Sequence, residues 1–151
     1  MKKLSLLVSL LVLLFACNKD KFQSTPQIKI KSTSGSIIAK GSGELTVVLS
    51  YTDKEGDVDD SVYVRKIRTN QRVAAETYRD TLGYAIPEFP AHSTGDISVT
   101  LDNTALVSAV KIVNLPNGTP EPDSLTIWFK VKDKAGHMSD SVSTGTIVVL
   151  R

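Results

Sequence analysis

Residues 44–51 read ELTVVLSY, and their side chains alternate between two classes. The apolar class consists of Leu45, Val47, Leu49 and Tyr51, and most residues between them are polar. A period of two places every second side chain on the same face of an extended strand. The stretch therefore predicts a strand with one face in a core and the other toward solvent.

The same pattern recurs on both sides of this stretch. Alternation continues at 28–30, 97–101 and 125–131, and runs rich in Val, Ile, Thr and Ser at 61–69, 106–115 and 141–150 are also expected to be strands. Residues 74–84 fit either a short helical turn or an edge strand. Turns rich in Gly, Asp and Pro are expected at 41–43, 53–60, 116–122 and 133–136. Seven to eight short strands without a convincing helix predict an all-β fold, an antiparallel Ig-like β-sandwich.

The N-terminus has the pattern of an export signal. Lys2 and Lys3 precede an apolar run at 4–16, which is shorter than the ~20 residues of a membrane-spanning helix. The run ends in Leu-Phe-Ala-Cys at 14–17, which resembles the bacterial lipobox and implies lipid attachment to Cys17. We therefore expect a lipoprotein signal peptide at 1–16, a lipidated Cys and flexible tether at 17–26, and an Ig-like domain at 27–151.

Residues after the cysteine suggest a location. Cys-Asn-Lys-Asp at 17–20 is similar to the Lys-acidic export signal of surface lipoproteins in the Bacteroidetes. This resemblance implies an outer membrane lipoprotein at the cell surface, with a periplasm-facing anchor as the alternative. Because Cys17 is the single Cys of the 151 residues, no disulfide within the chain is expected.

The charge balance excludes one class of partner. The chain has 18 basic and 16 acidic residues, a formal charge of +2. Loss of Lys2 and Lys3 with the signal peptide leaves 16 basic residues, so the mature chain is neutral. Nucleic acid is therefore not an expected partner.

Two stretches resemble a known kind of domain. SYTDKEGDV at 50–58 and FKVKDKAGHMSD at 129–140 are similar to a strand with its acidic loop and to the last hairpin of Ig-like and cadherin-like lipoprotein domains in the Bacteroidetes. His137 stands where those domains commonly have Asn. The resemblance implies an Ig-like fold, and the function of such domains is uncharacterised.

Residues 53–60 contain five carboxylates around Gly56. Calcium takes six to eight oxygen ligands, but the spacing here is not that of an EF-hand. Ig-like strand order places this loop and the 133–136 turn at the same end of the sandwich. The candidate calcium ligands are therefore Asp53, Glu55, Asp57, Asp59 and Asp133, and no other cofactor is expected. The alternative is that Asp and Gly serve as turn formers alone.

Trp128 lies between the alternating apolar residues of 125–131, on the other face of the expected strand. If the apolar face packs in the core, the indole points outward. An exposed Trp beside Lys130 is suited to stack on a sugar or to anchor a protein partner. The alternative is that a neighbouring loop or side chain covers it.

Four Asp-Ser/Thr-aliphatic triplets resemble the O-glycosylation acceptor of the Bacteroidetes. Their hydroxyl residues are Ser61, Thr81, Ser124 and Ser141.

Catalytic motifs are not found. His92 and His137 lie in separate expected loops without a Cys or Ser partner at a known spacing, and no nucleophile elbow or phosphate-binding Gly loop is present. We therefore expect a membrane-anchored, non-catalytic binding or adhesion module. The alternatives are a glycan-binding accessory lipoprotein of a sugar-uptake system and a structural subunit of an envelope complex.

Overall fold

The computed structural model describes residues 23–70, 79–108 and 110–151. The signal peptide, Cys17 and most of the tether lie outside these residues, so the predictions made for them stand as sequence-based expectations. No helix in the described part of the chain is long and apolar enough to cross a membrane.

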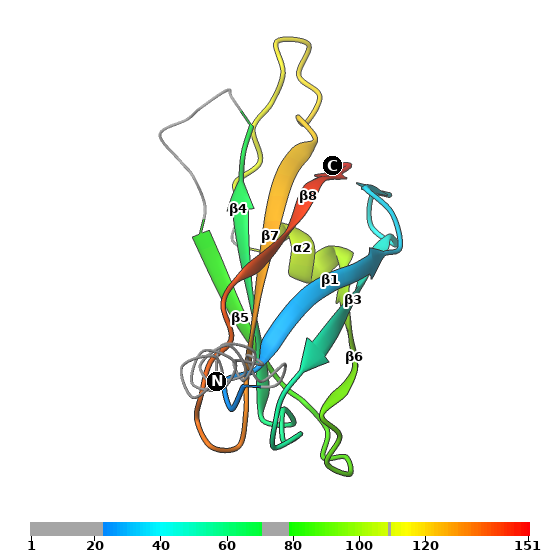
Figure 1. Cartoon of the computed structure of the whole chain (residues 1–151). Helices are drawn as coiled ribbons and strands as arrows, with labels where there is room; N and C mark the ends of the chain where they lie inside the picture. Colours follow the sequence, from blue (N-terminus) through cyan, green and yellow to red (C-terminus); the bar gives the residue numbers. More distant parts are fainter. Residues whose placement is uncertain (1–22, 71–78, 109) are drawn as a thin grey trace, which may run out of the picture.

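Eight strands and one short helix make up the described fold. They are β1 (Gln27–Thr33), β2 (Ile37–Ile38), β3 (Glu44–Thr52), β4 (Ser61–Arg68), β5 (Arg79–Ala85), β6 (Thr94–Asp102), α2 (Asn103–Val107), β7 (Asp123–Lys132) and β8 (Val142–Val149). The strands form a three-stranded sheet, β1-β3-β6, and a five-stranded sheet, β2-β8-β7-β4-β5. Figure 1 shows the two sheets as the two layers of a sandwich. The expected all-β, two-sheet fold is confirmed.

The strand order is that of an Ig-like sandwich. Taken as strands A, A′, B, C, C′, E, F and G in chain order, the sheets are A-B-E and A′-G-F-C-C′. All pairs are antiparallel except β2 with β8, which are parallel. That exception arises because the chain leaves β1 in one sheet and crosses to the edge of the other. The two-residue strand β2 is too short to give an alternation that a sequence could reveal.

The core lies between the two sheets and is built from alternate residues of each strand. In β3 and β7 every second side chain is buried, as the period of two predicts. Phe129 on β7 and Leu45 and Leu49 on β3 have no exposed surface. The remaining core members with no exposed surface are Val47, Val58, Val64, Leu101, Leu106, Leu125, Ile127, Val131 and Val149.

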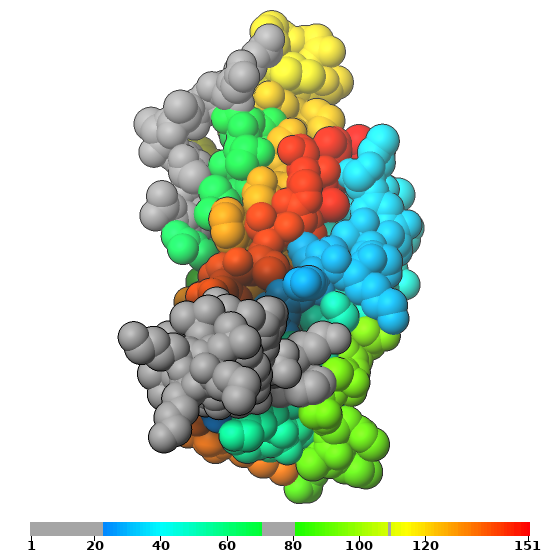
Figure 2. All heavy atoms as spheres, in the orientation of Figure 1, coloured from blue at the N-terminus to red at the C-terminus, as the bar shows by residue number. Residues whose placement is uncertain are grey.

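The prediction of a strand over 106–115 is wrong. Its first two residues belong to α2, and among the described residues 108 and 110–115 the one β-type pairing is an isolated bridge between Asn114 and Pro120. Asp102 caps the N-terminus of the helix by accepting a hydrogen bond from the Ala105 amide at 2.6 Å. Figure 2 shows the segment beyond the helix at one extremity of the molecule.

Lys66 on β4, in the five-stranded sheet, binds the C-terminal end of α2. Its side chain is 1% exposed, and its ammonium donates to the Ala105 carbonyl and to the carbonyl and hydroxyl of Ser108, the latter two at 3.0 and 2.8 Å. A cation that binds the last carbonyls of a helix satisfies groups that have no partner within it. Leu106 is thereby held in the core.

Two further segments, 74–84 and the residues before β1, can be compared with the sequence-based expectations. Of 74–84, the described part belongs to the edge strand β5, and the rest lies outside the described residues. The chain contacts the domain from Gln23 onward, because the Lys54 amide donates to the Gln23 carbonyl at 3.0 Å. Gln23, expected to be part of the tether, is therefore hydrogen-bonded to the β3–β4 loop.

Replacement of Lys66 by Met tests the role of this buried ammonium. Lys66→Met keeps the apolar stem but removes the ammonium, so the part-buried Ala105 carbonyl keeps only the Ser108 hydroxyl as a donor and the Ser108 carbonyl loses its lysine donor. We expect the free energy of unfolding to fall by about 1–3 kcal/mol in urea denaturation. Lys130→Met, at an exposed position of the neighbouring strand, should change it by less than about 0.5 kcal/mol. Equal effects of the two substitutions would contradict this role.

Candidate functional site

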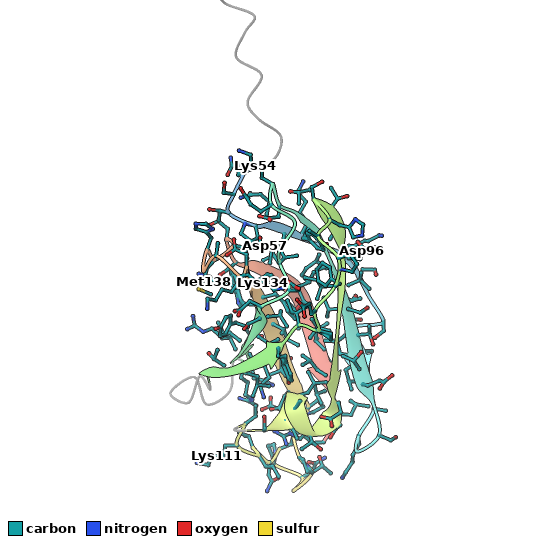
Figure 3. All side chains as sticks on the ribbon, turned by 90° about the horizontal axis from the view of Figure 1, so that it is seen from below. Lys54, Asp57, Asp96, Lys111, Lys134 and Met138 are labelled. Atoms are coloured by element: carbon teal, nitrogen blue, oxygen red, sulfur yellow. The ribbon has the colours of Figure 1, made fainter. Side chains whose placement is uncertain are left out.

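Three loops meet at one end of the sandwich. The β3–β4 loop (53–60) and the β7–β8 turn (133–141) are joined by a hydrogen bond from the Lys134 amide to the Asp57 carbonyl at 3.0 Å. The Asp53 amide donates to the Ser93 carbonyl of the β5–β6 loop at 2.9 Å. Figure 3 shows Lys54, Asp57 and Lys134 at this end and Lys111 at the opposite end. The expected meeting of the acidic loop with the last hairpin is therefore observed.

Three of the five predicted ligands converge at this end. Asp53, Asp57 and Asp133 each bring one carboxylate oxygen to a cluster in which all three atoms lie within 4.8 Å of one another. Asp53 is 0% exposed, Asp133 is 1% exposed and Asp57 is half-buried. We call these three side chains the carboxylate cluster.

The other two predicted ligands lie outside the carboxylate cluster. Glu55 is exposed and accepts a hydrogen bond from the Ser24 hydroxyl at 3.2 Å. Asp59 is buried, and its Oδ2 pairs with the Lys134 ammonium at 3.0 Å and accepts from the Phe89 amide at 3.3 Å. Burial alone raises the pKa of Asp59, but the hydrogen bonds from Lys134 and Phe89 outweigh it and lower the pKa.

Burial raises the pKa of Asp53 above its ordinary value. Hydrogen bonds from the Gly56 and Asp57 amides oppose this effect, and repulsion from the carboxylates of Asp57 and Glu55 adds to it. The charged form of Asp53 is therefore disfavoured by the protein around it. A group in this state gains most from a nearby positive charge.

Asp133 is held by His137 across the turn. Its Oδ1 accepts from the His137 amide at 2.7 Å, and its Oδ2 lies 3.0 Å from His137 Nδ1. The spacing of four residues with a glycine between them is the only sign of this pair in the sequence. The two contacts fix the carboxylate while each oxygen keeps a lone pair for a further ligand.

Gly56 sets the path of the acidic loop. Its φ is +72°, and its amide donates to Asp53 Oδ2 at 2.7 Å. A Cβ at this position would lie 2.6 Å from the backbone of His92. Only glycine combines this conformation with so close an approach of two backbones. The turn-forming role expected of Asp and Gly in this loop is thus observed together with the carboxylate cluster.

A second region lies on the outer face of the five-stranded sheet. A groove of about 590 Å³ is bounded by side chains of β4 and β7, with Tyr63 directly across from Lys130 and Arg65 across from Trp128. Trp128 is 36% exposed, so the indole faces outward as its phase predicts. None of the described side chains that line the groove is acidic. The other lining residues with exposed surface are Ile67, Thr81, Met138 and Ser141.

The four predicted O-glycosylation residues differ in accessibility. Thr81 and Ser141 are exposed and border the groove, whereas Ser61 and Ser124 are half-buried at the starts of β4 and β7. Ser61 also donates its hydroxyl to Asp60 Oδ2 at 2.9 Å. The exposed pair are therefore the better acceptor candidates.

Comparison with known proteins leaves the family open. No family model matches the chain, and no curated protein matches it. Among solved structures it is similar to Spo0M, the sporulation control protein of Bacillus subtilis, at TM-score 0.43 and 8% identity over 85% of this chain and 51% of that one. It is also similar to a late embryogenesis abundant (LEA) protein at TM-score 0.46 and 14% identity, over 99% of this chain and 86% of that chain. A β-glucosidase from Listeria innocua matches at TM-score 0.40 and 12% identity, over 85% of this chain and 16% of that chain.

Substitution of Gly56 tests how strictly the acidic loop is built. Gly41 also has a positive φ (+77°), but a Cβ there would contact nothing. Gly41→Ala should therefore lower the free energy of unfolding by about 1 kcal/mol. Gly56→Ala adds the clash with the His92 backbone and should cost about 1–3 kcal/mol beyond that control. Urea denaturation of both variants measures the difference. The same cost for both would mean that the loop does not need the close approach.

Proposed function

We propose that this chain is a membrane-anchored lipoprotein whose β-sandwich is a non-catalytic binding module. The observation that carries the proposal is the groove on the outer face of the five-stranded sheet. It presents the exposed indole of Trp128 among cationic side chains on a rigid pair of strands. Aromatic residues and arginine are the residue types that most often dominate binding energy at interfaces.

The chemistry of the groove favours a carbohydrate carrying carboxylate groups. An indole offers a flat apolar face on which a sugar ring can stack. Arg65 on β4 and Lys130 on β7 supply donors for hydroxyls and for anionic groups on either side of it. This supports the glycan-binding alternative over a purely structural subunit, which needs no such groove.

The proposed anchor rests on the lipobox-like pattern at 14–17. A lipid chain on Cys17 would hold the tether at the membrane, and Gln23, the first described residue, is hydrogen-bonded to the β3–β4 loop. The groove itself is lined by β4 and β7 on the outer face of the five-stranded sheet. We place the protein in the outer membrane, facing either the cell surface or the periplasm.

Replacement of Trp128 tests the binding module. Wild-type chain and Trp128→Ala are applied to an array of neutral and acidic glycans. We expect the wild type to bind acidic glycans, and the variant to bind at least about tenfold more weakly, a loss of about 1.4 kcal/mol. The matched control is Ile112→Ala, which truncates an apolar side chain that is 58% exposed outside the groove and should leave binding unchanged.

Three results would count against the carbohydrate ligand. These are no binding to any glycan, equal binding by the Trp128→Ala variant, and equal loss in the Ile112→Ala control. If glycans fail and cross-linking in the membrane instead joins the face around Trp128 to one protein, the module is an adhesion or assembly unit.

Replacement of Cys17 tests the anchor. Cys17→Ser removes the thiol on which the lipid would be attached. We expect the wild type in the membrane fraction with incorporated fatty acid, and the variant without fatty acid. The wild type in the aqueous fraction without label would contradict the lipoprotein assignment while leaving the groove untouched.

A further inference from the structure

The carboxylate cluster joins the two sheets. Asp53 directly follows β3 of the three-stranded sheet, and Asp133 directly follows β7 of the five-stranded sheet. Asp57 lies between them in the β3–β4 loop and is tied to the last turn through its carbonyl. Oxygens from two separate sheets thus lie within 4.8 Å, the spacing found around one shared ion.

Two buried oxygens of the cluster have no partner in the described part of the chain. No hydrogen-bond donor there reaches Asp53 Oδ1 or Asp57 Oδ1, although both atoms are shielded from solvent. Asp53 is 0% exposed, so its unpartnered oxygen points into the protein rather than into solvent. A buried carboxylate oxygen without a partner is costly, and a bound cation would remove the cost.

Two lysines of this end, Lys132 and Lys134, bind carboxylates outside the carboxylate cluster. The Lys134 ammonium lies 3.0 Å from both Asp59 and Glu88, and the Lys132 ammonium lies 3.4 Å from Asp60. Within the described residues, no ion pair connects a Lys or Arg to Asp53 or Asp57. In the part of the chain that the structure describes, the negative charges of Asp53 and Asp57 are therefore not neutralised by an ion pair with lysine or arginine.

The donor set favours calcium among the common cations. All three groups are hard carboxylate oxygens, and the ring nitrogen Nδ1 of His137 lies against Asp133 Oδ2. Zinc and copper prefer imidazole or thiolate ligands. Magnesium requires near-ideal octahedral geometry, whereas calcium accepts irregular sets of six to eight oxygens completed by water and carbonyls.

We propose that Asp53, Asp57 and Asp133 bind one calcium ion that links the two sheets at this end of the sandwich. This site is separate from the groove around Trp128 and does not depend on what that groove binds. Because the amide of Lys54 in this loop donates to the Gln23 carbonyl, the ion would also stiffen the loop that contacts the N-terminal end of the described chain.

Calcium binding is tested on the full chain in detergent by thermal unfolding and by calorimetric titration with CaCl₂. With only three protein carboxylates we expect a dissociation constant on the order of 10⁻⁴–10⁻³ M, as in extracellular calcium modules. At 10 mM CaCl₂ the unfolding midpoint should rise by about 5 °C over the same sample in EDTA at equal ionic strength. An equal concentration of MgCl₂ should give a much smaller rise.

Two substitutions separate the site from general loop charge. Asp57→Asn removes one ligand charge and should abolish the calcium-dependent rise, and in EDTA it should unfold no earlier than the wild type because repulsion within the carboxylate cluster falls. Glu55→Gln removes the same charge from the same loop but outside the carboxylate cluster, so the rise should remain. No rise in the wild type, or equal loss in both variants, would overturn the proposal.

Discussion

Burial of the alternating apolar side chains of β3 and β7 holds the two sheets together. Phe129 and the inward leucines of β3 have no exposed surface, and each buried side chain of this size contributes about 1.5–3 kcal/mol. The contact is made by strands at the centres of their sheets, so the neighbouring strands align to them by backbone hydrogen bonding. The ends of β3 and β7 are fixed relative to one another as a consequence.

The same packing concentrates negative charge at one end of the molecule. The residue after β3 and the residue after β7 are both aspartates, and the sheets hold them together despite their repulsion. Asp59 is accommodated by Lys134, and Asp133 by His137. One oxygen each of Asp53 and Asp57 is buried and accepts no hydrogen bond from the described residues. The groove around Trp128 lies on the opposite side of β7 from the core, so the two regions use different faces of one strand.

The sequence pattern predicts the parts of this architecture that depend on local periodicity. The strands β3 and β7, the outward position of Trp128 and the approach of Asp53 to Asp133 all follow from alternation and strand order. The strand expected over 106–115 does not form, and its first residues belong instead to α2, which is held by the Asp102 cap and by Lys66 from the five-stranded sheet. A local sequence pattern cannot show that Lys66 binds Ser108, because the two residues are 42 positions apart in the chain.

The separation of the acidic residues is likewise a tertiary effect. Glu55 and Asp59 flank Asp57 in the sequence, yet Glu55 faces solvent and Asp59 faces Lys134. The groove depends on the cross-strand register of β4 with β7, which places Arg65 opposite Trp128 and is not readable from either strand alone.

The most direct measurement of the central claim, that the core brings two loops into one cation site, is a calcium titration followed by amide chemical shifts. Amides of 53–58 and of 133–139 should shift together with a single dissociation constant, while those of 110–122 at the other end stay unchanged. Shifts in only one of the two loops, or shifts spread over exposed acids such as Glu44 and Asp140, would contradict the claim.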